Sequence, residues 1–368
     1  MCVHLKLLLF HLVTAASAFS SLKPYSCHDE ERAALLQFKQ GFVIDESASG
    51  DGAYPKVSSW NPAEGGTSNC SAWSGVQCDK RTGHVISLDL SSSCLYGSIN
   101  SSSSLFRLVH LQRLNLGHNN FNYSQIPTTV GNFPQLTYLN LSASVFFGQV
   151  PSQLSQLSKL SFLDLSFNLD PFLYEGLLSI RESDLRSLIR NLTTLEKLHL
   201  SFINISSTIP DSIANLSFLT SLLLNDCGLS GKFPARIFEL QDLETLDFSF
   251  NQLTGPIPSC LGNLSRLAYI DLFENSLHGT VEILKLENVT HLQLGGNKLE
   301  VLTESRTMNA TLPKFRKQLV WPSAEMDVER KHKNFGVSGP FCKLPYRLWS
   351  TFACCPSLGQ PTSFTTLS

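Results

Sequence analysis

The sequence predicts an α/β solenoid, a right-handed superhelix with a parallel β-sheet on its concave face and a helical, disulfide-linked cap at its N-terminal end. Two observations lead to this prediction. A pattern, Leu-x-x-Leu-x-Leu-x-x-Asn-x-Leu, recurs about nine times over residues 85–312, and a fixed period of this size indicates stacked repeats. The segment before the first copy has the apolar spacing of a helix, which would cover leucines that an open end exposes to water.

The third leucine position of the pattern fixes the register of the copies. It falls at Leu90, Leu116, Leu141, Leu165, Leu200, Leu224, Phe248, Leu272 and Leu294, with gaps of 26, 25, 24, 35, 24, 24, 24 and 22 residues. Each Leu-x-Leu segment has a period of two, which places both leucines on one face of a short strand. Stacked copies therefore predict a parallel sheet above a continuous leucine core.

The asparagine position is expected to close each turn, because a side-chain amide both donates and accepts hydrogen bonds. Its occupants are Asn119, Asn168, Asn251, Asn275 and Asn297. Cys227 takes the position in the sixth copy, and Ile203 should leave a gap in the ladder. Some copies continue into Gly-x-Ile-Pro, as at Gly255–Pro258, which predicts a second short extended segment on the outer side.

The two ends differ from the repeats. Residues 1–18 combine Lys6, an apolar run and a small-residue site at Ala16-Ser17-Ala18, the pattern of a secretory signal peptide. Residues 19–84 are predicted to form the cap, with a helix over Asp29–Gln40. Residues 313–368 carry no copy of the pattern, and we expect a disordered tail.

One repeat is longer than the others. The 35-residue gap between Leu165 and Leu200 holds an insert over residues 169–190, with a predicted helix around Ser183–Arg190. After the signal, no stretch reaches about 18 apolar residues, so no transmembrane segment is expected in this chain. A net charge of −2 argues against a nucleic-acid partner.

Ten Asn-x-Ser/Thr sequons predict a glycoprotein of the secretory pathway. They begin at Asn69, Asn100, Asn122, Asn140, Asn191, Asn204, Asn215, Asn263, Asn288 and Asn309. Some of them could recur simply because the repeat contains Asn-Leu-Ser/Thr, but a secreted chain would still meet the glycosylation machinery.

The chain has ten cysteines, and nine remain if Cys2 leaves with the signal. Cys70 and Cys78 flank a compact loop before the first repeat, and we predict that they form a disulfide that contributes about 2–3 kcal/mol. Cys94 and Cys260 are interpreted as buried structural thiols. The sequence leaves open the pairing of Cys27, Cys94, Cys260, Cys342, Cys354 and Cys355.

Several segments carry a family resemblance. Cys27–Lys39, Ser59–Asn61 and Trp73–Cys78 resemble the plant leucine-rich-repeat N-terminal cap, and Thr82–Ile99 resembles the opening repeats of plant receptor-like proteins of the tomato Cf and apple scab-resistance type. The resemblance implies an ectodomain that recognises extracellular peptides or proteins and signals through a partner kinase. It also implies a location in the apoplast or, for a full-length family member, at the plasma membrane.

The chain departs from the family in two places. Family members usually carry adjacent cysteines before the cap tryptophan, the first of which pairs with the far N-terminal cysteine; here Cys70 stands alone, which puts a partner for Cys27 in doubt. The pattern also stops after Phe315, where family members continue with more repeats and a membrane helix. We therefore interpret the chain as a truncated ectodomain without its membrane anchor.

Residues between the leucines point out of the concave face, and exposed aromatic groups beside polar groups are typical of a protein-binding surface. The candidate ligand-binding residues are Arg113, Tyr138, Phe162, Lys197, His199, Phe202, Tyr269 and His291. The alternative for the phenylalanines that follow the strands is packing against neighbouring coils.

The aspartates of the strands raise the alternative of an enzyme. Asp164, Asp247 and Asp271 share a column, and paired carboxylates can hydrolyse glycosides. Strands in neighbouring repeats lie about 4.8 Å apart, however, and the pattern provides no second wall for a cleft, so we expect no enzyme and no cofactor. The histidines show no metal-ligand spacing. The remaining alternatives are a secreted inhibitor of fungal polygalacturonase, which the 169–190 insert disfavours, and a non-functional truncated product.

Overall fold

The computed structural model describes residues 27–61, 69–282, 286 and 288–302, which lie in one compact unit. The predicted signal peptide, the predicted tail, Asn309 and the three cysteines of the tail lie outside the described residues.

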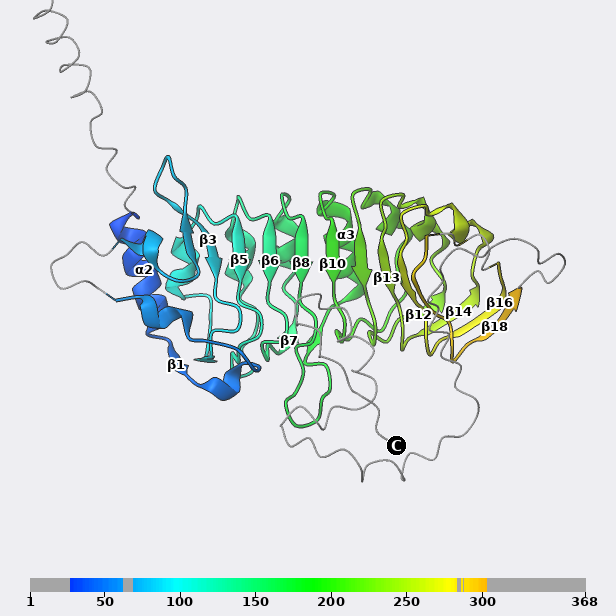
Figure 1. Ribbon diagram of the computed structural model, residues 1–368, viewed down its shortest axis with the longest axis horizontal. Coiled ribbons are helices and arrows are strands. Elements are labelled where there is room, and N and C mark those ends of the chain that lie inside the picture. The colour runs from blue at the N-terminus through cyan, green and yellow to red at the C-terminus, as the bar shows by residue number, and fades with distance from the viewer. Residues whose placement is uncertain (1–26, 62–68, 283–285, 287, 303–368) are drawn as a thin grey trace, which may run out of the picture. The chain divides into compact units, whose positions relative to one another are not determined.

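The repeats, with one strand of the cap, build a ten-stranded sheet, seen face-on in Figure 1. Its strands, in spatial order, are β17 (His291–Gln293), β15 (Tyr269–Asp271), β13 (Thr245–Asp247), β11 (Ser221–Leu223), β10 (Lys197–His199), β8 (Phe162–Asp164), β6 (Tyr138–Asn140), β5 (Arg113–Asn115), β3 (Val85–Asp89) and β2 (Val76–Cys78). All neighbours pair in parallel except β2 and β3, which are antiparallel. The predicted leucine-rich solenoid is confirmed.

The leucines align across the sheet and form the core. Leu114 pairs with Leu139, Leu139 with Leu163, and Leu163 with Leu198. Within this sheet, the central residue of each strand from β5 to β15 is at most 1% exposed. Burial of one such side chain stabilises the fold by about 1.5–3 kcal/mol. Because each of these strands is only three residues long, this burial comes from stacking and not from any single coil.

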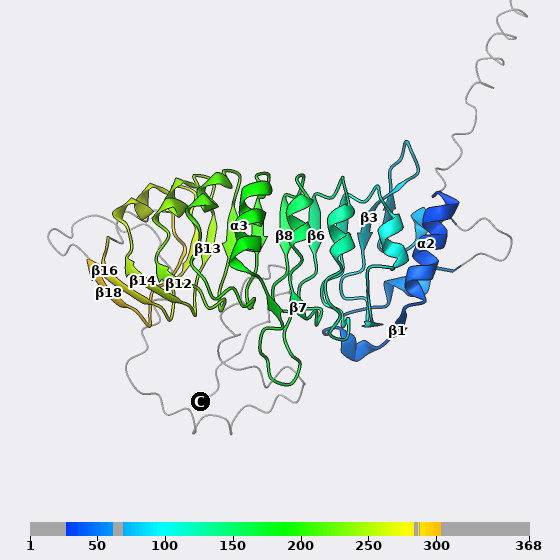
Figure 2. The same ribbon diagram turned by 180° about the vertical axis from the view of Figure 1, so that it is seen from behind.

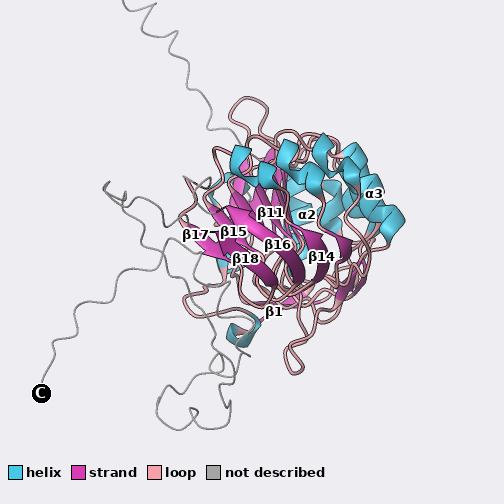
Figure 3. Ribbon diagram, turned by 90° about the vertical axis from the view of Figure 1, so that its right-hand side faces the viewer, coloured by secondary structure: helices cyan, strands magenta, loops and turns pink. Residues whose placement is uncertain are grey.

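The side of the core opposite the sheet carries helical turns (Figures 2 and 3). These are η4 (Ser104–Arg107), η5 (Thr128–Asn132), η6 (Ser152–Gln156), η7 (Asp211–Asn215), η8 (Ala235–Glu239) and η9 (Ser259–Asn263). A proline precedes each turn from η5 to η9, where its fixed φ starts a turn and its missing N–H is not needed. In the long repeat the turn is replaced by helix α3 (Glu182–Asn191), as predicted.

A second parallel sheet follows the Gly-x-Ile-Pro segments. It contains β12 (Ser230–Lys232), β14 (Gln252–Pro256), β16 (Ser276–Glu282) and β18 (Lys298–Leu302). An earlier pair, β7 (Gly148–Gln149) and β9 (Leu178–Ser179), has the same parallel arrangement. Gly255 adopts a φ of +87°, a conformation that favours glycine. The predicted second extended segment is confirmed.

The asparagines form the expected ladder. The Asn251 Oδ1 accepts the N–H groups of Cys227 and Leu229 at 3.1 and 2.9 Å, and its Nδ2 donates to the carbonyls of Leu224 and Phe248 at 2.8 and 3.0 Å. Asn119, Asn168, Asn275 and Asn297 also bond both ways to backbone groups of their own and the preceding coil. At the gap in the ladder, Ile203 packs into the core.

Helix α2 (Asp29–Lys39) caps the end of the stack beside β3 (Figure 1). Its Ala34 and Leu35 are fully buried, and the Ala34 carbonyl accepts the Ser104 hydroxyl at 2.8 Å. The rest of the cap comprises β1 (Phe42–Ile44), paired antiparallel with β4 (Leu95–Gly97), and the turns η1 (Glu46–Ala48), η2 (Lys56–Ser59) and η3 (Cys70–Ala72). The predicted capping helix is confirmed.

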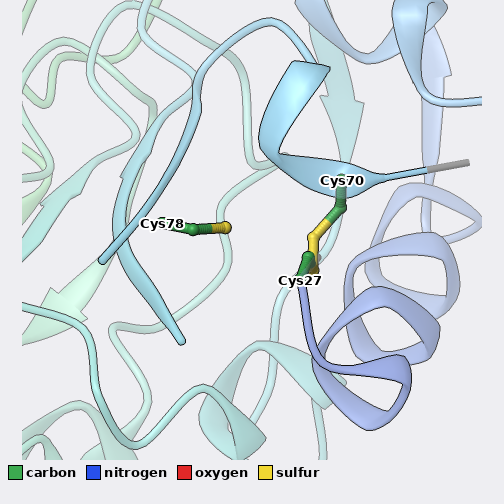
Figure 4. A group of neighbouring side chains, drawn as sticks. All are labelled: Cys27, Cys70 and Cys78. Carbon is green, nitrogen blue, oxygen red and sulfur yellow. A yellow bond between two sulfur atoms is a disulfide. The ribbon is translucent and has the colours of Figure 1, made fainter. Parts of the chain in front are cut away.

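The predicted disulfide between Cys70 and Cys78 is wrong. Cys70 pairs with Cys27, with their Cα atoms 5.5 Å apart, and Cys78 is a free thiol (Figure 4). The Asn69 Oδ1 accepts the Cys27 N–H at 3.0 Å, which holds the start of α2 against η3. The three sulfur atoms lie within 4.8 Å of one another, so sequence proximity could not identify the pair. Of the other predicted thiols, Cys94 is buried and Cys260 half-buried.

The last described coil is less well covered than the others. Leu292, Leu294 and Leu299 are only partly buried against the core, whereas the equivalent Leu246 and Phe248 are fully buried.

We expect C27S to lower the free energy of unfolding by about 2–5 kcal/mol, because the bond closes a long loop in the unfolded chain. C78S should leave stability within about 0.5 kcal/mol of the unsubstituted protein. Mass mapping of non-reduced peptides and chemical denaturation of both variants test this. Detection of a peptide linked through Cys70 and Cys78, together with an unchanged free energy of unfolding for C27S, would contradict the Cys27–Cys70 pairing.

N251A should destabilise its coil by about 3 kcal/mol, since several buried backbone groups lose their partners at once. Because stability in a solenoid is mostly a nearest-neighbour property, the loss should be local. Hydrogen exchange at the amides of Cys227 and Leu229 measures it directly, and Q252A, at the exposed next residue, is the matched control. Unchanged protection of both amides in N251A would refute the proposed role.

Candidate ligand-binding surface

One row of side chains crosses the outward face of the sheet in register. Its members, in order, are Arg113, Tyr138, Phe162, Lys197, Ser221, Thr245, Tyr269 and His291. We call this the outer row. It contains six of the eight predicted ligand-binding residues, although they span almost 180 residues of sequence. The repeat brings them together because each occupies the same position of its coil.

The N-terminal part of the outer row is a continuous stack. The Arg113 guanidinium carbon lies 3.5 Å from the centre of the Tyr138 ring, and the Tyr138 and Phe162 rings stack at 4.1 Å. Arg113 also lies 3.6 Å from Asp89, which pairs with Lys56 at 3.1 Å. These contacts hold the rings in place while they remain partly exposed, so the stack presents a rigid, amphipathic surface.

His199 stands beside this stack, two residues beyond Lys197 on the same strand. Its ring meets Phe162 edge-on at 5.6 Å between centroids, its Nε2 lies 2.9 Å from the Ser221 hydroxyl, and its Nδ1 lies 3.7 Å from Asp164. The side chain is 15% exposed. His199 therefore contributes more to the arrangement of the surface than to its open area.

The C-terminal part of the outer row is a second, smaller stack. The rings of Tyr269 and His291 lie parallel, with centroids 4.2 Å apart. Burial lowers the pKa of His291 below its ordinary value, which favours the neutral imidazole. Lys197, Ser221 and Thr245 separate the two stacks with polar side chains.

Phe202 does not belong to the surface, and its prediction as a ligand-binding residue is wrong. It is 6% exposed and its ring lies 5.1 Å from that of Phe167 in the preceding coil. Its φ is +62°, and residues at the same position of other coils, including His118, Phe250 and Glu274, share this left-handed backbone. The chain leaves the strand at this residue, so the side chain packs between coils, as the alternative interpretation held.

Two buried carboxylates lie next to the outer row on β13 and β15. Asp247 and Asp271 are register partners and each is 2% exposed. Burial raises the pKa of Asp247 to about 6, and burial together with the charge of Asp247 raises that of Asp271 to about 7. The sequence signal was the recurrence of aspartate at one position of adjacent coils, but sequence alone did not reveal the burial.

The described sequons occupy two kinds of position. Seven are exposed, at Asn100, Asn122, Asn191, Asn204, Asn215, Asn263 and Asn288. Asn69 and Asn140 are partly buried, and Asn140 lies in β6, two residues beyond Tyr138. Glycosylation of these sites remains a prediction.

Family comparisons agree with this architecture. Residues 28–79 match the leucine rich repeat N-terminal domain, and residues 110–133, 194–216 and 242–264 match the leucine rich repeat. The chain therefore combines a leucine-rich-repeat N-terminal cap with leucine-rich repeats.

The chain is similar to plant receptor-like proteins. It is 41% identical to Receptor-like protein 6 of Arabidopsis thaliana over 212 residues, which are 55% of this chain and 21% of that protein. It is 36% identical to Receptor-like protein Cf-9 of Solanum pimpinellifolium over 227 residues, 58% of this chain and 25% of that protein. The matched region thus spans about a quarter or less of these relatives.

Among solved structures, the ectodomain of the Arabidopsis receptor kinase HAESA, in complex with the peptide hormone IDA and the co-receptor SERK1, is similar at a TM-score of 0.53 and 28% identity. The match covers 74% of this chain and 50% of that one. In the part of this chain that is described, no helix has both the length and the apolar character needed to cross a bilayer.

The buried aspartate pair predicts a pH-dependent stability. An unfolded aspartate has a pKa of about 3.9, so between about pH 4 and pH 7 the folded protein binds more protons than the unfolded chain. Stability contributed by the pair is therefore highest near pH 4 and falls as pH rises to about 7. D271N should remove most of this dependence of stability on pH. As the pH rises from about 4 to about 7, the free energy of unfolding of D271N should therefore grow by a few kcal/mol relative to that of the unsubstituted protein.

Chemical denaturation at a series of pH values measures the effect. The lowered pKa values of His118 and His291 act in the opposite sense, but they are common to both proteins and cancel in the difference. D211N, at an exposed aspartate, is the matched control. A difference between D271N and the unsubstituted protein that stays constant with pH would show that Asp271 is ionised throughout.

Proposed function

We propose that the chain is the extracellular ligand-recognition part of a plant receptor-like protein, and that the outer row binds a peptide or protein ligand. The observation that carries the proposal is the row itself: stacked, partly exposed aromatic rings, with a guanidinium at one end, aligned across an otherwise regular sheet. Interface hot spots are enriched in tyrosine and arginine held in such settings. The similarity to receptor-like proteins and to a peptide-binding ectodomain supports it.

The outer row suits an extended ligand. Tyr138 and Phe162 are already stacked, so a ligand would not need to order them on binding, which lowers the entropic cost of association. The partly exposed side chain of Thr245 offers a hydrogen bond between the two stacks. A binding module that needs no chemistry of its own fits this surface, and we propose no enzymatic activity.

The proposal includes a secreted or cell-surface glycoprotein with a co-receptor kinase as a further partner. The predicted signal at residues 1–18 and the exposed sequons support the secretory route. The complex of HAESA with a co-receptor supports the second partner by similarity. Whether the ligand signals defence or development depends on its identity.

A peptide-capture experiment tests the binding surface. The glycosylated protein would be immobilised and exposed to the peptide fraction of plant extracellular fluid, and any retained peptide would be synthesised and titrated. Combined Y138A and F162A substitutions should weaken its binding at least 100-fold, since each buried aromatic contact contributes about 2 kcal/mol. F218A removes an exposed phenylalanine outside the strands of the sheet and is the matched control.

Two results would contradict the proposal. One is a retained peptide whose affinity is unchanged by the double substitution. The other is strong inhibition of fungal polygalacturonase at sub-micromolar concentration, which would move the function to that of an inhibitor.

A further inference from the structure

A cluster of metal-ligating side chains lies at the N-terminal end of the stack and includes no member of the outer row. It consists of Glu31 from α2, His84 just before β3 and His110 in the loop before β5. Each offers one donor atom, and these three atoms lie within 4.8 Å of one another. The cluster thus joins the cap to the first two coils.

The repeat explains why the histidines meet. His84 stands six residues before Leu90, and His110 six residues before Leu116, so they occupy the same position of consecutive coils. Their rings stack with centroids 3.7 Å apart. The expectation of no metal-ligand spacing among the histidines rested on short distances along the sequence. His84 and His110 are instead one repeat apart, and the stacking of coils brings them together.

The carboxylate is held in place. Glu31 is 7% exposed, its Oε2 accepts the Val85 N–H at 2.9 Å, and its Oε1 lies 3.3 Å from the His84 Nδ1. The opposite face of the His84 ring is covered by His28, at 4.0 Å between centroids. Two of the three donors are therefore fixed by the fold, and His110, on a loop, is the one that can adjust.

We infer that Glu31, His84 and His110 bind a divalent transition-metal ion of the zinc class. Two imidazole nitrogens with one carboxylate oxygen suit zinc, copper or nickel better than magnesium or calcium, which prefer oxygen ligands. A tetrahedral zinc ion with bonds of about 2.0–2.2 Å holds its donors roughly 3.3–3.6 Å apart. To bind the ion, the His110 ring would have to rotate out of its stack on His84, so that the nitrogen lone pairs of both rings point at one position. Water would complete the coordination, and the ion would tie α2 to the first two coils.

Calorimetric titration of the chelator-stripped full chain with Zn²⁺ tests the site. We expect one ion per chain, with no comparable binding of Mg²⁺. H110Q should weaken Zn²⁺ binding at least tenfold and abolish any rise in unfolding midpoint caused by Zn²⁺. H278Q, at an exposed histidine on β16, should bind within twofold of the unsubstituted protein. In the presence of chelator, H110Q should unfold at the same midpoint as the unsubstituted protein, which separates a lost ligand from a damaged fold.

Cobalt substitution identifies the donors. The visible d–d bands of the Co²⁺ form should indicate nitrogen and oxygen ligands, and its near-ultraviolet spectrum should show no thiolate-to-metal charge-transfer band. Such a band would place the ion on cysteines, of which Cys78 is the nearest free one to the cap disulfide. That band, equal affinity in H110Q, or no Zn²⁺ binding by the unsubstituted protein would overturn the inference.

Discussion

The structure depends on how each coil satisfies the backbone groups of the turn that follows its strand. Those groups face the interior, where water cannot reach them, and an unpaired buried N–H or C=O is costly. An asparagine at one fixed position supplies an acceptor to the preceding coil and donors to its own. These hydrogen bonds couple neighbouring coils and keep their strands in one register. They therefore also align the side chains on the outward face of the sheet.

Features that repeat were predictable from sequence, and features that occur once were less so. The sheet register followed from nine leucine positions that agree with one another, so a weak copy such as the one with Ile203 did not disturb the assignment. The disulfide had no such redundancy: Cys70 lies near both Cys27 and Cys78, and the path of the cap decides between them. The prediction that Phe202 binds ligand was wrong for a local reason, because its left-handed backbone turns the side chain away from the sheet face.

The same logic explains which surface groups could be found. Outer-row residues were identified because a period of two and a period of about 24 residues together specify a face. Burial of Asp247 and Asp271 could not be predicted, because it depends on the side chains of neighbouring coils. The histidine cluster was missed because its members belong to different coils and to the cap. In a stacked protein, two residues that are one repeat length apart in sequence lie side by side in the structure.

Asn140 carries a sequon on the sheet face itself, two residues beyond Tyr138. Its Oδ1 accepts the N–H and hydroxyl of Ser142, whereas a glycan is attached through Nδ2, so a sugar there would leave these hydrogen bonds intact. The sugar would, however, project from the sheet face beside the stacked rings of Tyr138 and Phe162. A slender, extended chain could still pass along the row, but a broad globular partner would be held off. Carbohydrate, and not only side chains, would then select ligands by their width.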